Sequence, residues 1–255
     1  MALDRYDESF YRDQAARSET SARVVVKVVN DIVEPRSVVD IGCGTGAWLK
    51  VFKEFGAERV VGIDGGNISA DELRIAPEEF VSANLTEPFP VEGPFDLVVS
   101  LEVAEHLDSN AADQFVERLI ALGRVVLFSA AIPGQGGTHH VNEQWPSYWV
   151  AKFAHHGYRL LDCVRPAIWD SCDVDIHYAQ NTMLFLAESI SIPADLVGLT
   201  ASGHIVDMVH PRLFSKNTRH PALASMSRRF PSLGIRVKQV LRLTRGLETS
   251  SRGST

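Results

Sequence analysis

The chain has 255 residues, of which 45% are hydrophobic and 22% charged, and its formal net charge at pH 7 is −7. These proportions are typical of a globular α/β domain with a modest extension. No run approaches eighteen apolar residues and the N-terminus is polar, which argues against a transmembrane helix and a secretory signal. The three cysteines show no CxxC spacing, so we expect the reducing environment of the cytoplasm.

The charge is unevenly distributed along the chain. Residues 205–255 contain ten basic and two acidic side chains, a formal charge of +8, whereas the preceding 204 residues carry −15. DNA-binding domains carry their basic patch on the folded body, so an acidic body argues against a DNA partner. We expect a main domain over residues 1–194 and a basic extension over 195–255. The extension could cover a site, support a homodimer, bring the protein to an anionic surface, or be a loosely ordered, solvated tail with one helix.

Seven short apolar runs, rich in β-branched residues and bounded by Gly, Pro or Asp, predict buried strands. They cover residues 37–41, 59–64, 79–83, 95–100, 124–129, 158–164 and 182–187. Apolar residues at helical spacing fill segments between them, for example 48–55 and 115–122. Residues 6–35 are also predicted to be helical, which would make residues 1–35 a cover over the sheet or the site. Alternating strands and helices predict a seven-stranded, mostly parallel sheet with helices on both faces, in which the last two strands could pair antiparallel.

A glycine-rich turn, Gly-Cys-Gly-Thr-Gly over residues 42–46, follows the first predicted strand. Glycines let such a turn close tightly and bring backbone N–H groups against a ligand. Asp40 stands just before the turn, and Asp64 ends the next strand, where a ribose diol would lie in a nucleotide-binding sheet. Asn84 follows the third strand, where it could meet a base edge. The spacing differs from the dinucleotide pattern G-x-G-x-x-G, so the turn alone is compatible with a structural turn or a nucleotide site.

The segments VVDIGCGTG, VVGID, FVSANL and FDLVVSLEVAEHL occur in an order that resembles the class I S-adenosylmethionine-dependent methyltransferases. The resemblance covers about residues 36–187 and implies a Rossmann-like α/β fold with S-adenosylmethionine as cofactor. It implies that Asp40 and the turn hold the methionine end and that Asp64 holds the ribose. Many relatives have Asp where this chain has Asn84, which would frame the adenine. The cofactor-binding residues that we expect are Asp40, Gly42, Cys43, Gly44, Gly46, Asp64, Asn84, Leu85, Ser100 and Leu101.

Two acids and an imidazole follow the fourth predicted strand, in Glu102-Val-Ala-Glu105-His106. Positions i, i+3 and i+4 of a helix share one face, so these side chains should converge beside the cofactor. Carboxylates suit Mg²⁺ or Mn²⁺, and an imidazole shifts the preference toward Mn²⁺, Fe²⁺ or Co²⁺. A Glu-His pair also occurs here in methyltransferases without a metal, where the Glu contacts the methionine end. The residues alone therefore leave both interpretations open.

The motif Glu-x-x-Glu-His resembles the pattern with which ubiquinone-pathway O-methyltransferases and small-RNA 3′-end 2′-O-methyltransferases hold Mg²⁺. The RNA enzymes add a later His in a His-x-x-Glu context, similar to His140-Val-Asn-Glu143. The resemblance thus implies a divalent metal, Mg²⁺ or Mn²⁺. The ligands that it implies are Glu102, Glu105, His106 and His140. The candidates for catalysis are Glu105, His106 and His139.

A polar loop over residues 131–148 should lie at the carboxyl edge of the sheet, where open α/β sheets bind ligands. It resembles methyltransferases of bacterial polysaccharide and glycoside biosynthesis. The residues expected to bind a sugar, by ring stacking or by hydrogen bonds, are Asn142, Glu143, Gln144, Trp145, Tyr148 and Gln180. A sugar hydroxyl is a poor nucleophile at pH 7 and needs a base or a metal, which favours O-methylation as the use of the acid/His cluster.

The sequence therefore predicts a metal-assisted O-methyltransferase that acts on a carbohydrate or glycoside acceptor. One alternative is a phenolic or quinone-type acceptor, whose pocket should be more apolar than this loop. Another is the 3′-terminal ribose of an RNA, which the acidic body disfavours because phosphates bind to basic surfaces. A fourth hypothesis, a non-catalytic S-adenosylmethionine-binding subunit, does not account for a glycine turn and an acid/His cluster that are both complete.

Overall fold

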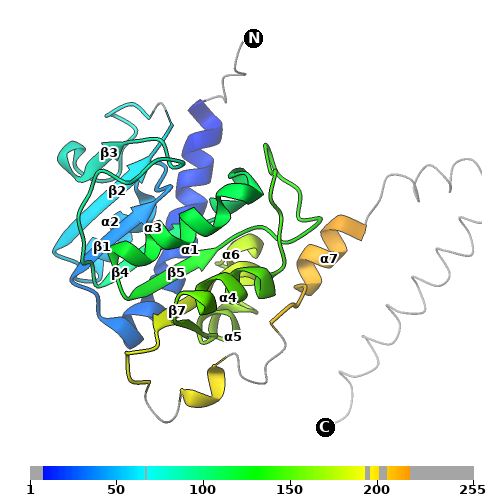
Figure 1. The fold of residues 1–255 in the computed structure, drawn as a ribbon. Helices are drawn as coiled ribbons and strands as arrows, with labels where there is room; N and C mark the ends of the chain where they lie inside the picture. Colours follow the sequence, from blue (N-terminus) through cyan, green and yellow to red (C-terminus); the bar gives the residue numbers. More distant parts are fainter. Residues whose placement is uncertain (1–7, 67, 193–195, 201–205, 219–255) are drawn as a thin grey trace, which may run out of the picture. The chain divides into compact units, whose positions relative to one another are not determined.

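The computed structural model describes residues 8–66, 68–192, 196–200 and 206–218. The chain divides into two units, Met1–Leu213 and Phe214–Thr255, and the description below concerns the first. Its centre is a seven-stranded sheet with the order β3-β2-β1-β4-β5-β7-β6 (Figure 1). The predicted Rossmann-like class I fold, with a seven-stranded and mostly parallel sheet, is confirmed.

Five strands are parallel and two reverse direction. The parallel strands are β1 (Ser37–Ile41), β2 (Arg59–Asp64), β3 (Phe80–Ser82), β4 (Leu97–Leu101) and β5 (Val125–Ser129). The last strands, β6 (Tyr158–Leu161) and β7 (Met183–Ala187), pair antiparallel, as predicted, and β7 is also antiparallel to β5. The strand order reverses between β1 and β4, and the carboxyl ends of strands at such a switch point are where doubly wound sheets bind ligands.

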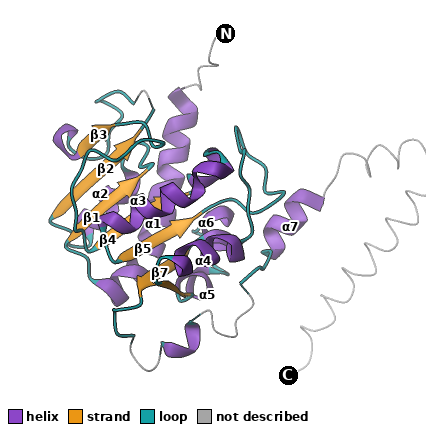
Figure 2. Ribbon diagram, in the orientation of Figure 1, coloured by secondary structure: helices purple, strands orange, loops and turns teal. Residues whose placement is uncertain are grey.

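Helices cover both faces of the sheet (Figure 2). One face packs against α1 (Glu8–Val33), α2 (Ala47–Glu54), α5 (Val164–Ile168) and α6 (Ile176–Asn181). The other packs against α3 (Ala112–Leu122) and α4 (Pro146–His155). Successive residues of a strand pack on opposite faces of the sheet. Val38 is buried in the core under α1 and α2, and Val39 in the core under α3 and α4. This double burial explains why the strands read as continuous apolar runs.

Short turns and one further helix complete the described elements. The 3-10 turns are η1 (Pro77–Glu79), η2 (Ala104–His106), η3 (Ser109–Ala111) and η4 (Val197–Leu199), and the last helix is α7 (Pro211–Thr218). None of the helices in the described ranges combines the length and apolar character that crossing a bilayer requires.

Helix α1 lies close to the bounds predicted for the N-terminal helix. Val25 and Val29 recur at helical spacing and are fully buried against the sheet layer, where each contributes about 1.5–3 kcal/mol through burial. Pro35 follows the helix and disfavours its continuation. An ion pair of 2.8 Å between Lys50 and Glu19 joins α2 to α1.

Part of the predicted 195–255 extension packs on this same unit. Residues 196–200 make an antiparallel bridge to Leu161 of the edge strand β6. Residues 206–213 include His210, whose side chain is buried at 4% exposure. The remainder of the extension beyond residue 218 lies outside the described residues.

Candidate active site

The turn after β1 is shaped by three glycines in the left-handed region of backbone space, with φ of 84° at Gly42, 52° at Gly44 and 82° at Gly46. A Cβ at Gly42 would lie 2.3 Å from Val103 Cγ2, and one at Gly46 would lie 2.8 Å from Ile75 Cγ1. At Gly44 a Cβ would meet no atom within 4 Å. Two glycines are thus required by packing, whereas the middle one leaves open space beside the backbone, as a ligand would need.

Two carboxylates flank this turn. Asp64, at the end of β2, accepts hydrogen bonds of 2.8 Å from the N–H groups of Gly44 and Gly66. Asp40 lies inside β1 at 3% exposure. Burial, and then the nearby charge of Asp64, raise the pKa of Asp40 to about 8. Burial also raises the pKa of the Cys43 thiol, which makes the thiol a poor nucleophile at neutral pH.

The other residues predicted to bind the cofactor follow β3 and β4. Asn84 closes a turn after β3, because its Oδ1 accepts from the N–H and the hydroxyl of Thr86 at 3.0 and 2.9 Å. Leu85 is half-buried against the α3 layer. Ser100 is fully buried and its Oγ has no hydrogen-bond partner in the described part of the chain, while Leu101 ends β4 at 8% exposure. All of them lie toward the carboxyl ends of neighbouring strands, so their assignment to the cofactor stays a prediction that the fold permits.

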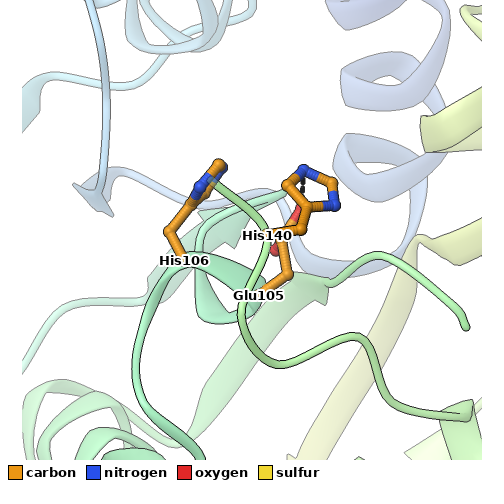
Figure 3. Close-up of side chains that lie close together, drawn as sticks. All are labelled: Glu105, His106 and His140. Atoms are coloured by element: carbon orange, nitrogen blue, oxygen red, sulfur yellow. Dashed lines mark ion pairs between the residues drawn. The ribbon is translucent and has the colours of Figure 1, made fainter. Parts of the chain in front are cut away.

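The acid/His cluster lies after β4. Candidate ligand atoms of Glu105, His106 and His140 lie within 4.8 Å of one another. Figure 3 shows Glu105 and His140 facing each other, with His106 beside them. Glu105 Oε1 is 4.0 Å from His140 Nε2. Glu105 is fully buried, and neither carboxylate oxygen has a hydrogen-bond partner among the residues described. Burial, and then the charge of Glu102, raise the pKa of Glu105 to about 9. A carboxylate in this setting requires either a proton or a cation.

His140 is oriented by Glu143. The ring nitrogen Nδ1 is 3.0 Å from Glu143 Oε1, and since a carboxylate accepts, Nδ1–H donates and Nε2 is left bare toward Glu105. Glu143 also accepts from the backbone N–H groups of Gly134 at 2.7 Å and Gly136 at 2.9 Å. These three bonds hold the pKa of Glu143 below its usual range against the opposing effect of its burial. Such a carboxylate–histidine pair is the usual support of a metal-binding imidazole.

His106 is oriented in the same sense by a backbone carbonyl. Its Nδ1 lies 3.3 Å from the carbonyl oxygen of His139, so Nδ1–H donates and Nε2 is the bare nitrogen. Burial, and then the neighbouring His140, lower the pKa of His106, which favours the neutral ring that a metal needs. The His106 and His140 rings meet edge to face, with centroids 4.9 Å apart.

The two segments that supply the cluster are joined through the backbone. The carbonyl of Glu105 accepts hydrogen bonds from the N–H groups of Val141 at 2.9 Å and Asn142 at 3.0 Å. The segment that carries Glu105 and His106 is therefore fixed directly to the loop that carries His140.

Glu102 stands beside this group of three. Its backbone has a positive φ of 55°, and its carboxylate accepts from Gln135 Nε2 at 2.7 Å and from Asn181 Nδ2 at 2.9 Å. Asn181 also donates to Gln135 Oε1 at 2.9 Å. The structure therefore gathers three of the four predicted ligands and gives the fourth two amide partners. Gln135 and Asn181 are not among the site residues predicted from the sequence, although Gln135 lies in the predicted polar loop.

A pocket of about 560 Å³ opens at the cluster. It is bounded by residues in the first half of α1, the start of α6, the segment after β4 and the loop after β5. The lining residues are Arg17, Ser18, Glu102, Glu105, His106, Gln135, Gly136, Gly137, Thr138, His139, His140, Asp175, His177 and Tyr178. Among these lining residues no side chain is Ala, Val, Leu, Ile or Met, and the ring of Tyr178 is the single benzenoid ring. The lining includes three carboxylates and one guanidinium, although carbon atoms form more than half of its exposed surface.

The residues predicted to bind an acceptor lie elsewhere, or act indirectly. Glu143 holds His140, as described above. Asn142 is 2% exposed and accepts from Gln144 Nε2 at 3.0 Å. Gln180 is fully buried, and its amide is bonded to the backbone of residues 208–210. Trp145 is 40% exposed. Tyr148 packs on α4 beneath the ammonium of Lys152. None of the six is among the lining residues of the pocket given above.

Part of the pocket lining was not predicted from the sequence, namely Arg17, Ser18, Asp175 and His177. An acid and an imidazole two residues apart, Asp175-Ile-His177, are a signal in the sequence that could have pointed to it. Asp175 is hydrogen-bonded to Ser21 of α1, which precedes it by 154 residues in the sequence, and no local pattern predicts such a contact.

Comparison with known proteins gives a consistent fold. The model of a family described as "Methyltransferase domain" matches residues 11–163. No curated protein sequence shows a significant match. The methyltransferase domain of the bacterial protein CtHen1 is 22% identical with a TM-score of 0.49, over 66% of this chain and 96% of that one.

Two further solved structures share the architecture. The putative methyltransferase in complex with the Haloferax volcanii Trm112 methyltransferase activator is 13% identical with a TM-score of 0.53, over 73% of this chain and 97% of that one. Streptomyces venezuelae DesVI is 14% identical with a TM-score of 0.51, over 71% of this chain and 98% of that one. At these identities the likeness concerns the fold.

Proposed function

The chain belongs to the methyltransferase-domain family, and from this premise we propose that it is a divalent-metal-assisted O-methyltransferase that transfers the methyl group of S-adenosylmethionine to a carbohydrate hydroxyl. The observation that carries the acceptor class is the set of side chains around the pocket at the acid/His cluster, none of which is Ala, Val, Leu, Ile or Met. The family membership supports methyl transfer; the acceptor, the metal and the site residues are our proposal.

The turn after β1 fits the cofactor. Gly44 leaves open space beside its backbone, while Asp64 lies at the end of the next strand. When bound, S-adenosylmethionine supplies a methyl group already activated on a sulfonium, so positioning of the reactants dominates the chemistry. We assign the methionine end to Asp40 and the turn, the ribose hydroxyls to Asp64, and the adenine edge to Asn84 with Leu85.

The cluster after β4 fits a divalent cation. The test is Glu105, whose two buried oxygens lack partners among the described residues, next to two imidazoles with bare Nε2 atoms. We propose Glu105, His106 and His140 as its ligands. When bound, such a cation lowers the pKa of a hydroxyl that it contacts. Glu102 lies outside the group of three, and we propose that its carboxylate, oriented by the amides of Gln135 and Asn181, supports the cation from beside these ligands.

The acceptor loses a proton as its oxygen attacks the methyl carbon and the bond from that carbon to sulfur breaks. With Glu105 and His106 engaged at the cation, His139 is our candidate for the base that receives this proton. His139 lines the same pocket, and its backbone has a positive φ of 60°. Its own carbonyl oxygen orients His106. A base within hydrogen-bond reach contributes typically 10²–10⁴-fold, roughly, to such a step.

The side chains that line the pocket favour one of the three candidate acceptor classes. A phenolic or quinone-type ring would be expected to meet apolar walls, and the lining offers no aliphatic side chain. An RNA end would need basic side chains for the phosphates next to its ribose, and the lining residues include a single Lys or Arg, Arg17. Hydroxyl groups of a neutral sugar can both donate to the carboxylates and accept from the remaining groups. This match supports a carbohydrate over the other two.

The proposal is tested by incubating the protein with methyl-labelled S-adenosylmethionine and a panel of methyl glycosides, oligosaccharides, catechols and short RNAs, with and without EDTA. We expect label in a carbohydrate and loss of labelling with EDTA that Mg²⁺ or Mn²⁺ restores. Labelling of catechols or RNA alone would overturn the acceptor class. Labelling that persists after thorough chelation would overturn the role of the metal.

A further inference from the structure

The loop after β5 comes close to the imidazole of His140 at Gly137. A Cβ at Gly137 would lie 2.2 Å from Nε2 of His140, 2.4 Å from Cε1 and 2.7 Å from Cδ2. A point at the same distance along the axis of the Nε2 lone pair would be farther from both ring carbons. The position therefore lies over the face of the ring, and the backbone of Gly137 covers the Nε2 edge of the imidazole while the lone pair stays free.

Gly137 restrains the part of the ring that the other contacts leave free. Glu143 accepts from Nδ1 of His140 at 3.0 Å, and the ring of His106 lies edge to face with it at a centroid distance of 4.9 Å. An imidazole that is bonded through Nδ1 can still tilt about this bond, which would move Nε2 away from Glu105 Oε1, now 4.0 Å distant. The backbone of Gly137 limits that tilt at the Nε2 edge.

The backbone conformation at position 137 does not itself require glycine. Gly134 and Gly136 of the same loop have φ of 81° and 70°, whereas φ of Gly137 lies outside the left-handed region. Alanine at position 137 would therefore meet no backbone strain, and the three nearest atoms to its Cβ would all belong to His140. Because these atoms form the far end of a side chain, the ring could turn away while the fold stays intact. The missing side chain thus matters to the orientation of His140.

We propose that Gly137 is a positioning residue of this site: because it has no side chain, its backbone packs on the His140 ring and keeps Nε2 directed at the divalent cation. The groups that orient a metal-binding imidazole contribute strongly to metal affinity. A larger residue at position 137 displaces the ring by steric contact and leaves every proposed ligand in the chain. This inference rests on the proposed function, since it takes His140 as a ligand of the cation.

The test is calorimetric titration of Gly137→Ala and of the wild-type protein with Mn²⁺. We expect the dissociation constant for Mn²⁺ to rise about tenfold or more, as for other lost supports of metal-binding histidines. The dissociation constant for S-adenosylhomocysteine and the urea midpoint of unfolding should stay at their wild-type values. Gly198→Ala is the matched control and should leave Mn²⁺ affinity unchanged. The φ of Gly198 also lies outside the left-handed region, and a Cβ there would meet no atom within 4 Å.

The histidine ring signals in the NMR spectrum of the metal-free protein supply the second readout. The signals of His140, assigned by their loss in His140→Asn, should move in Gly137→Ala, whereas those of His155 on α4 should not.

Wild-type Mn²⁺ affinity in Gly137→Ala, or unmoved His140 signals, would overturn this inference and leave the proposed function standing. A loss of stability and of S-adenosylhomocysteine affinity together with Mn²⁺ affinity would show that Gly137 serves the fold, and would also overturn it. If the wild-type protein binds no Mn²⁺, the proposed role of the metal fails and this inference with it.

Discussion

The turn after β1 and the cluster after β4 are both loops at the carboxyl ends of neighbouring parallel strands, yet they are built in different ways. The turn presents backbone, and its shape follows from three glycines in five residues. The cluster presents side chains, and it needs Glu105 from one loop and His140 from another. The turn is thus a local structure that can be substituted one residue at a time. The cluster is a tertiary structure whose parts depend on one another.

The largest effect should come from the centre of the cluster. Glu105→Ala removes the buried carboxylate that we assign to the cation, and we expect methyl transfer to fall by about 10³-fold or more. S-adenosylmethionine binding, measured by calorimetry, should change little because the turn is a separate structure. The exposed acid Glu117 of α3, changed to Ala, serves as the control. Near-normal turnover in Glu105→Ala would contradict the assignment of the cluster.

The turn should respond differently at neighbouring glycines. In Gly42→Ala the new Cβ would clash with Val103 in a left-handed backbone, which we expect to destabilise the fold by about 2–4 kcal/mol. In Gly44→Ala no protein atom is in the way, so the cost should be about 1–2 kcal/mol and the main loss should be cofactor affinity. Urea unfolding and S-adenosylhomocysteine titration measure the two effects. Equal stability losses at both positions would contradict this division.

The support of His140 should show in metal affinity. In Glu143→Ala the Nδ1–H of His140 and the N–H groups of Gly134 and Gly136 all lose their acceptor. We expect Mn²⁺ binding to weaken by about 10–100-fold, the range known for lost partners of metal-binding histidines. Calorimetry reports this change directly. A variant with wild-type Mn²⁺ affinity would show that His140 needs no partner to hold its orientation.

The last prediction concerns pH and involves one carboxyl group from each region. The pKa of Asp40 is raised to about 8 and that of Glu105 to about 9, so between about pH 5 and 8 the folded protein holds protons that the unfolded chain has lost. The free energy of unfolding of the metal-free protein should therefore fall as pH rises, by up to about 1.4 kcal/mol per pH unit for each group.

The check is urea unfolding at several pH values in the presence of EDTA. In Glu105→Gln one titrating group is gone, so the slope should become shallower and stability at pH 8 should rise, although activity is lost. Mg²⁺ should stabilise the wild-type protein at pH 8 and leave Glu105→Gln almost unchanged. Stability that increases from pH 5 to 8 would contradict the burial of both carboxyl groups in the folded state.

Much of the fold could be predicted because its signals are local. The strands at 37–41 and 59–64 have the predicted bounds, since double burial makes each a short apolar run that ends at Gly or Asp. The turn and the Glu-x-x-Glu-His motif could also be recognised, because their residues are adjacent in the chain. The assembly of these parts into one edge of a sheet follows from parallel pairing.

The pocket wall could not be predicted, for two physical reasons. A polar residue near a site can bind a ligand or satisfy the protein's own backbone, and Glu143 and Gln180 do the second. Whether a backbone donor needs such a partner depends on the folded loop. Asp175, by contrast, enters the site through its contact with Ser21, 154 residues earlier in the chain. Only tertiary structure brings such residues together.

The two hydrogen bonds from Val141 and Asn142 to the carbonyl of Glu105 have a consequence for how this site can change. They couple the segments 102–106 and 139–143 into a single rigid piece, so a shift of one segment carries the other with it. A sequence change that alters either segment alone would misplace ligands on both. The site is therefore built by a pair of segments that are separated in the sequence. Grafting it onto another sheet would require both segments.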